Sequence, residues 1–256
     1  MARAKGRSSS GGRMQLRAHL VEFRKRLVLS ALGLVVGAVA GWLLYEPVFR
    51  ALMQPLLDAG VARQGDITLN FSGVATSFDM KIRVSLFLGL LITSPWWLYQ
   101  LWAFITPGLT RKERFYAISF LTASVPLFLL GAYLAWWALP NAVNLLTEFT
   151  PSGAVNYIDA QGYLTFVMQL ILAFGIAFLL PVVMVALNFV GLVQARTWAR
   201  GWRWSVMFAF AFAAIMTPTP DVVTMVALAI PICLLYVAAV VVCQAAALRG
   251  KSGTSV

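Results

Sequence analysis

Long stretches without a charged side chain dominate this sequence. Six such runs can each hold one helix: Leu27–Tyr45, Val84–Thr110, Phe115–Thr147, Ala160–Arg196 (whose last residue is the first charge), Trp204–Pro220 and Val222–Leu248. A helix needs about 20 apolar residues to cross a bilayer. Since 61% of all residues are hydrophobic and only 11% are charged, the chain is predicted to be a polytopic membrane protein, an all-α bundle of six transmembrane helices.

Loop and turn residues give this bundle its expected shape. Residues typical of loops stand beside the two longest spans: Pro140, Asn141, Pro151, Gly153, Asn188 and Gly191. Span five, from about Trp204 to Met216, would be ~20 Å long against a hydrocarbon core of ~30 Å. The mismatch predicts local thinning of the bilayer. A tight turn over residues 217–222 joins spans five and six, Pro231 is expected to interrupt span six, and the bundle is expected to be cupped.

The segment before the first span is basic and patterned as a helix. Leu16, Leu20, Phe23 and Leu27 fall on one helical face. An alternative is a cleaved signal peptide, because residues 38–40 (Ala-Val-Ala) resemble a cleavage site. The apolar stretch continues beyond that point, which favours a retained span. We expect a disordered tail over residues 1–14, one six-span domain over 15–248 and a cytoplasmic tail over 249–256, with the translation start open between Met1 and Met14.

Positive charges predict the orientation of the bundle. The side of the two termini carries most of them: Arg3, Lys5, Arg7, Arg13, Arg17, Arg24, Lys25, Arg26, Arg111, Lys112, Arg114, Arg196, Arg200, Arg203, Arg249 and Lys251. The other side carries four: Arg50, Arg63, Lys81 and Arg83. Because cytoplasmic loops are enriched in Lys and Arg, both termini are predicted to be cytoplasmic.

Acidic residues follow the opposite distribution, with two exceptions. Seven are predicted to lie outside: Glu46, Asp58, Asp66, Asp79, Glu148, Asp159 and Asp221. Glu22 and Glu113 remain as acids on the basic cytoplasmic face, where they could receive a cation from solution. Two plainer roles stay open: Glu22 stands four residues before Arg26, as in a helical ion pair, and residues 110–113 fit a helix-capping box.

No enzymatic chemistry is indicated. His19 is the one histidine, and Cys233 and Cys243 lack the spacing of a metal or redox motif. Phosphate-binding and nucleophile motifs are missing from the sequence. An ion-coupled carrier would place ionisable residues at membrane depth, where this chain has neutral candidates such as Gln169. We therefore expect no enzyme, no cofactor or metal and no nucleic-acid partner. The basic face by itself indicates little, because anionic lipid head groups attract such a face in any membrane protein.

Several ordered motifs resemble one family. They are "HLVEFRKRL" (residues 19–27), Pro55, Phe78 and Lys81, "SPWWLYQLWAFITPGLTRKER" (94–114), "FGIAFLLPV" (174–182) and "MTPTPDVVTMVALAIPICLLY" (216–236). Together they resemble TatC, the C subunit of the twin-arginine protein translocase, over roughly residues 15–245. The resemblance implies six spans with both ends in the cytoplasm of a bacterial cell, and export of folded proteins driven by the proton motive force.

The resemblance also implies a binding site for signal peptides. TatC proteins bind the paired arginines of these peptides through glutamates at the positions of Glu22 and Glu113. The turn residues Phe104, Pro107 and Gly108 would shape the pocket, with His19 and Arg24 beside it.

Further partners are implied as well: TatA- and TatB-type single-span subunits, other copies of the chain in a receptor complex, and membrane lipids. Partner-binding candidates lie around the last turn: Met216, Thr217, Pro218, Asp221 and Met225. Two positions depart from the family pattern, since Leu179 stands where many members have a glutamate in span four and Val237 replaces the glutamate of a Leu-Tyr-Glu motif. Two other functions stay open, an ion-coupled small-molecule transporter and a structural membrane scaffold.

Overall fold

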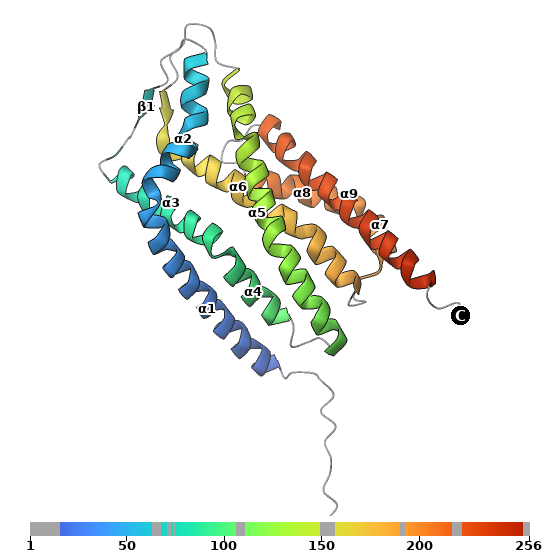
Figure 1. Cartoon of the computed structure of the whole chain (residues 1–256). Coiled ribbons are helices and arrows are strands. Elements are labelled where there is room, and N and C mark those ends of the chain that lie inside the picture. Colours follow the sequence, from blue (N-terminus) through green and yellow to red (C-terminus); the bar gives the residue numbers. More distant parts are fainter. Residues whose placement is uncertain are drawn as a thin grey trace, which may run out of the picture.

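The computed structural model describes residues 16–62, 68–70, 73, 75–105, 111–148, 157–189, 193–216 and 222–252. Within them the chain forms the helices α1 (Leu16–Leu43), α2 (Tyr45–Ala62), α3 (Thr76–Ile92), α4 (Ser94–Ile105), α5 (Arg111–Glu148), α6 (Ala160–Phe189), α7 (Ala195–Arg200), α8 (Trp202–Met216) and α9 (Val222–Ser252), and the strands β1 (Thr68–Asn70) and β2 (Tyr157–Asp159). Figure 1 shows the helices as one bundle. The α-helical class predicted from the apolar runs is confirmed, with the two short strands as an addition.

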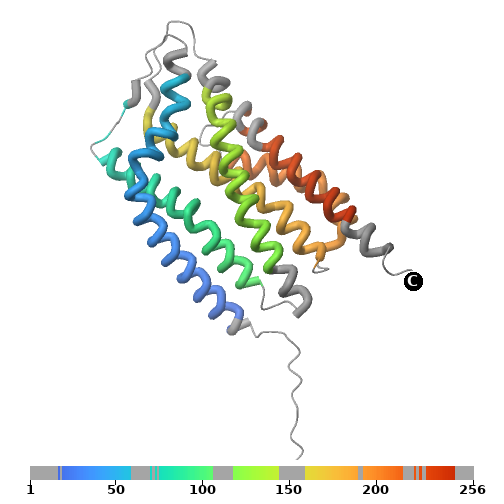
Figure 2. Tube along the Cα trace, in the orientation of Figure 1, coloured from blue at the N-terminus to red at the C-terminus, as the bar shows by residue number. Residues whose placement is uncertain are grey.

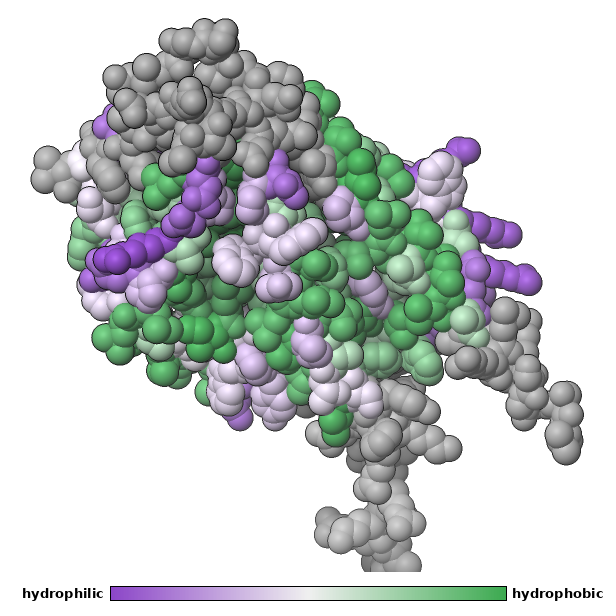
Figure 3. Space-filling view, turned by 45° about the horizontal axis from the view of Figure 1, so that its top comes forward, coloured by the Kyte–Doolittle hydropathy of each residue, from purple (hydrophilic) through white to green (hydrophobic). Residues whose placement is uncertain are grey.

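Within the described ranges, three helical segments are long and apolar enough to cross a membrane: His19–Leu43, Ile118–Val143 and Ala160–Phe189. Helices α3 and α4 qualify together as a fourth, broken span, bent by 61°. Two shorter apolar helical segments, Trp202–Ile215 and Ala229–Ala245, bring the described segments to the number of runs in the sequence. Figure 3 shows a broad apolar surface with polar groups toward its edges, as a membrane-embedded face requires. Six crossings stay a prediction.

The bend between α3 and α4 has a local cause. Thr93 ends α3, and its backbone N–H still donates to Gly89 O at 2.9 Å. Pro95 follows in the first turn of α4, where a missing N–H is tolerated but the ring hinders continuation of the preceding helix. Pro95 therefore accounts for the position of the break. The bend places α4 beside the start of α1.

Small residues let α1 pack closely on α3. Gly33, Gly37 and Gly41 recur every fourth residue along one face of α1. A Cβ atom at Gly37 would stand 2.7 Å from Gly89 O, a backbone atom of α3. Only glycine allows this approach, so the glycine row sets the position of α1.

Helix α6 forms the centre of the molecule. It packs against α5, α9, α8 and α3, and Figure 2 shows α1 and α9 at opposite edges of the bundle. Its side chains Leu164, Val167 and Ile171, spaced by three and four residues, are buried among the other helices.

Several loop expectations were wrong. Pro140 and Asn141 lie inside α5, which continues to Glu148. Pro55 also lies within a helix, α2. Pro231 does not interrupt α9, which runs on to Ser252. Each proline removes one backbone donor, but the remaining hydrogen bonds carry the helix past it.

A small parallel ladder joins two segments at the end of the bundle opposite the start of α1. Strand β1 pairs with β2, with Leu69 opposite Ile158. Nearby, the buried Tyr163 hydroxyl donates to Leu52 O at 3.0 Å and ties α6 to α2. Figure 1 shows this end far from the start of α1 and the end of α9, which lie toward the other end of the bundle.

Helix α8 is short, as expected. Its 15 residues span roughly 22 Å at 1.5 Å per residue, less than the ~30 Å hydrocarbon core. It begins at Trp202, two residues before the predicted start.

Candidate functional site

Glu22 lies on the first turns of α1 in a small polar cluster. Its Oε1 atom accepts a hydrogen bond from Arg26 Nε at 2.7 Å, and the Glu22 side chain keeps 23% of its exposure. Arg26 Nη1 donates to Gln100 Oε1 on α4 at 2.9 Å. Gln100 itself is only 2% exposed. The helical ion pair weighed as a plainer role for Glu22 is thus present, and it is anchored by a third residue.

Aromatic rings border this cluster. The ring of Phe104, near the end of α4, stacks on His19 with centroids 4.4 Å apart and an interplanar angle of 28°. Phe23 meets the same ring edge-on at 5.4 Å. Because residues 19, 22, 23 and 26 share one side of α1, Phe104 lies next to the carboxylate-bearing face.

A hydrogen bond from α4 fixes this face. Trp96 Nε1 donates to Leu29 O at 2.9 Å, one turn beyond Arg26. Arg24 and Lys25 are exposed to the surroundings. The structure therefore brings His19, Glu22 and Phe104 together, and leaves Arg24 on the exposed surface of α1.

The other expected site residues are only partly described. Glu113 is the third residue of α5, which begins at Arg111, a position that fits the capping box; its side chain lies outside the described residues. Pro107 and Gly108 also lie outside them. The separation of the two glutamates thus stays untested.

The expected partner-binding residues are also only partly described. Met216 ends α8, with its side chain outside the described residues, as are Thr217, Pro218 and Asp221. Met225 lies in α9, where its side chain is half-buried against the hydrophobic core.

Two members of the cluster, Arg26 as a bridge and Gln100 as its anchor, were missed by sequence reasoning. A signal existed, because Gln100 is the one amide side chain in the apolar stretch of residues 94–105. A buried amide needs a hydrogen-bond partner. What the sequence lacks is the register of α1 against α4 that identifies Arg26 as that partner.

Polar groups at membrane depth are mostly satisfied within their own helices. Thr93 Oγ1 donates to Gly89 O and Thr165 Oγ1 to Gln161 O, each at 2.7 Å. Gln169 Oε1 is buried and has no hydrogen-bond partner among the described residues. Leu179, within α6, contributes no polar group. Among the described residues, His, Cys, Asp and Glu form no group of three that could hold a metal ion.

The chain is similar to known proteins in sequence and in fold. The family model described as Sec-independent protein translocase protein (TatC) matches residues 18–231. The TatC protein of Xylanimonas cellulosilytica is 58% identical over 224 residues, which cover 88% of this chain and 81% of that protein. The TatC protein of Rothia mucilaginosa is 37% identical and covers 91% of this chain and 80% of its own length.

A solved structure is also similar. A crystal structure described as the twin-arginine translocase receptor TatC matches with a TM-score of 0.80 and 34% identity, over 90% of this chain and 99% of that one.

Proposed function

The chain belongs to the TatC family of Sec-independent protein translocase proteins, and from this membership we propose that it binds the paired arginines of twin-arginine signal peptides through Glu22 and Glu113. In this function it is a multi-pass protein of the bacterial cytoplasmic membrane with both termini in the cytoplasm. It works with TatA- and TatB-type single-span subunits, and with other copies of itself, to export folded cargo.

The observation that carries the proposal is that the Arg26 guanidinium makes two hydrogen bonds, one to Glu22 and one to Gln100. The contact between Arg26 and Glu22 joins Nε to Oε1, and Arg26 Nη1 donates to Gln100 on α4. A carboxylate has about four acceptor positions on two oxygens. The partly exposed Glu22 thus keeps acceptor capacity for a second guanidinium that arrives from solution.

The rings of Phe104 and Phe23 beside Glu22 support a preference for arginine. A guanidinium is planar, stacks on aromatic faces and can offer two parallel N–H donors to one carboxylate, whereas lysine is a compact point charge. Phe104 and Phe23 border the face that carries Glu22. A peptide arginine that meets Glu22 would lie against these rings.

The direct test is peptide affinity in Glu22 variants. Removal of one partner of a desolvated charge pair costs roughly 2–5 kcal/mol of affinity, so Glu22→Ala and Glu22→Lys should bind a synthetic twin-arginine peptide at least tenfold more weakly. Glu22→Gln, which keeps shape but loses charge, should lie between wild type and Glu22→Lys. Affinity and melting temperature are measured on the same purified, detergent-solubilised protein.

A matched control separates recognition from helix stabilisation. Glu46 forms the same type of pair with Arg50 on α2, with an N–O distance of 3.2 Å. Glu46→Lys should change peptide affinity little and should cost under about 1 kcal/mol of stability, because the Glu46–Arg50 pair is exposed. If folded Glu22→Lys binds the peptide as wild type does, the receptor role is wrong and a structural scaffold becomes the better function.

A further inference from the structure

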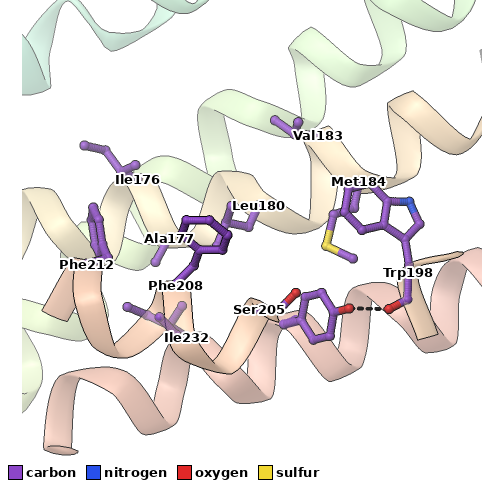
Figure 4. A pocket seen from close by; sticks show the side chains of 12 residues that line it. Ile176, Ala177, Leu180, Val183, Met184, Trp198, Ser205, Phe208, Phe212 and Ile232 are labelled. Atoms are coloured by element: carbon purple, nitrogen blue, oxygen red, sulfur yellow. Dashed lines mark hydrogen bonds between the residues drawn. The ribbon is translucent and has the colours of Figure 1, made fainter. Parts of the chain in front are cut away.

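Two cavities between the helices differ in chemistry. The larger one, of about 360 Å³, lies between α6, α8 and α9, and the residues described along it include no charged side chain. Figure 4 shows Ile176, Phe212 and Ile232 at one of its ends. The smaller cavity, of about 260 Å³, lies between α2 and α5. Its lining combines a carboxylate with two indole rings and two prolines.

The carboxylate of Asp58 gives the smaller cavity a negative charge. Asp58 Oδ1 accepts a hydrogen bond from Gln54 Nε2 at 2.9 Å, and both residues line the cavity. Within the described part of the chain Asp58 forms no ion pair, whereas Glu46 on the same helix is paired with Arg50. The amide of Gln54 therefore orients the Asp58 carboxylate without neutralising it.

Two prolines add backbone acceptors to the same cavity. Pro55, inside α2, has no N–H to donate to the carbonyl of Ala51, four residues earlier. Pro140, inside α5, likewise has none for the carbonyl of Trp136. Both prolines and both carbonyl-bearing residues line the cavity. Its wall thus offers two backbone oxygens that lack their usual helical donor.

Trp136 and Trp137 supply the aromatic part of the wall. Both line the cavity, and they are 44% and 66% exposed. The face of an aromatic ring attracts a cation, and tryptophan does so most strongly. The indole N–H groups of these two residues make no hydrogen bond to other described residues. The cavity therefore attracts a cation and has donors left for a neighbouring anion.

The position of the cavity along α5 indicates the depth of its ligand. The apolar segment of α5 that can cross a membrane ends at Val143, and the α5 residues of the cavity lie near that end. Tryptophan is enriched where a membrane meets water. Figure 1 shows α2 and this part of α5 at the end of the bundle opposite the start of α1. A ligand in the cavity would lie at the level of lipid head groups.

We propose that this cavity binds the primary ammonium group of an aminophospholipid such as phosphatidylethanolamine. A primary ammonium has three N–H donors, which match the Asp58 carboxylate and the carbonyls of Ala51 and Trp136. The indole rings stabilise its positive charge, and their N–H groups are available to the phosphate beside it. The rings favour an organic cation over a hard metal ion, which takes oxygen ligands on all sides.

Native mass spectrometry tests the proposal. The protein is purified in detergent, stripped of lipid and mixed with the dioleoyl form of phosphatidylethanolamine, phosphatidylcholine or phosphatidylglycerol. The choline ammonium carries the same charge but no N–H donor. Wild type should therefore retain phosphatidylethanolamine roughly tenfold more than phosphatidylcholine, because each hydrogen bond to a charged group adds affinity. Phosphatidylglycerol, which has no cation, should be retained no better than phosphatidylcholine.

A matched pair of acids tests the carboxylate. Asp58→Asn keeps the shape and removes the charge, so retention of phosphatidylethanolamine should fall severalfold at an unchanged melting temperature. Glu46→Gln removes one negative charge from the same helix at a residue outside the cavity. This control should leave retention as in wild type.

A matched pair of prolines tests the backbone acceptors. Pro140→Ala returns a helical N–H donor to Trp136 O, so retention of phosphatidylethanolamine should fall. Pro126→Ala makes the same change at another exposed proline of α5, which does not line the cavity. Retention should then stay unchanged. Because alanine is the better helix former, these variants decide the matter even if Asp58→Asn does not fold.

Three results would overturn the proposal. One is equal retention of phosphatidylethanolamine and phosphatidylcholine by wild type. Another is undiminished retention of phosphatidylethanolamine by folded Asp58→Asn. The third is an equal change of retention in Pro140→Ala and Pro126→Ala, which would show that the carbonyl of Trp136 makes no contact with the ammonium group.

Discussion

At the residue scale, Gln100 holds the candidate site together. Its oxygen accepts from Arg26, which in turn contacts Glu22. Replacing it by leucine would leave a partly buried guanidinium donor unpaired, a loss of about 1–3 kcal/mol. Gln100→Leu should therefore lower the melting temperature, and it should weaken peptide binding as Arg26 turns fully toward Glu22.

A second amide offers the control for that measurement. Gln54 donates to Asp58 at 2.9 Å on the exposed surface of α2. Gln54→Leu should leave both melting temperature and peptide affinity near wild type, because water replaces the lost bond. Gln100→Glu keeps an acceptor for Arg26 and should restore stability. An unaffected Gln100→Leu would show that the anchor plays no part in placing Glu22.

The sequence predicts individual site residues better than their contacts. Glu22 stands out from charge sorting alone, since it is an acid in a basic segment. Glu22 is linked to Gln100 through Arg26, and this link depends on the register of α1 against α4. Helical periodicity defines the faces of each helix, but it carries no information on that register.

At the scale of elements, the glycine row of α1 controls its distance from α3. A methyl group at Gly37 would meet Gly89 O at 2.7 Å and Thr93 Cγ2 at 2.5 Å. Gly37→Ala must push the helices apart, although alanine favours a helix by itself. We expect a loss of about 1–3 kcal/mol, seen as a lower melting temperature together with weaker peptide binding.

The matched control is Gly162→Ala at the exposed start of α6. The added methyl there would meet only Asp159 side-chain atoms, at 3.3 Å and beyond. This variant should be neutral or slightly more stable, because alanine is the better helix former. Equal melting temperatures for the two variants would mean that close α1–α3 contact contributes nothing.

The short helix α8 gives the second prediction at this scale. If its roughly 22 Å length thins the bilayer for cargo passage, insertion of four leucines after Met207 removes the mismatch. Export of a twin-arginine reporter should then fall strongly while peptide binding stays normal, since Glu22 lies on another helix. Full export by this variant would exclude mismatch from the mechanism.

The boundaries of the helices could not be predicted from the charge-free runs. The charge-free run Phe115–Thr147 ends within one residue of the end of α5, yet α5 already begins at Arg111, among charged residues, and it continues through Pro140 and Asn141, where a loop was expected. Likewise, α2 forms over residues 45–62 in a segment too polar for a span. Composition indicates which segments are apolar enough to lie in a membrane, whereas backbone hydrogen bonding decides where a helix ends.

At the scale of the whole molecule, the open question is the direction in which the bundle crosses the membrane. The excess of Lys and Arg on the side of the termini predicts that both ends are cytoplasmic. Single cysteines, introduced in a background without Cys233 and Cys243, test this with a membrane-impermeant thiol reagent. The positions are Ser10, Thr110 and Ser252 on the expected inner side, and Asp66 and Ser152 on the outer side.

The labelling pattern should follow the charge count. In intact cells the reagent should label only the two outer positions, and the inner three should react after the membrane is opened. The native cysteines lie in α9, with Cys243 buried, so their replacement by alanine should leave the bundle intact. Labelling of the inner positions in intact cells, with protection of Asp66→Cys, would reverse the orientation.

The hydrogen bond between Tyr163 and Leu52 has a consequence for the order of assembly. These residues lie 111 positions apart, and strands β1 and β2 join the same two regions of the chain. Neither tie can form before residues 157–163 have been synthesised, so until then the growing chain must hold α1 against α3 by local packing alone. A nascent chain that stops before residue 157 should then be open to proteases at α2, and the arrival of α6 should close it in one cooperative step.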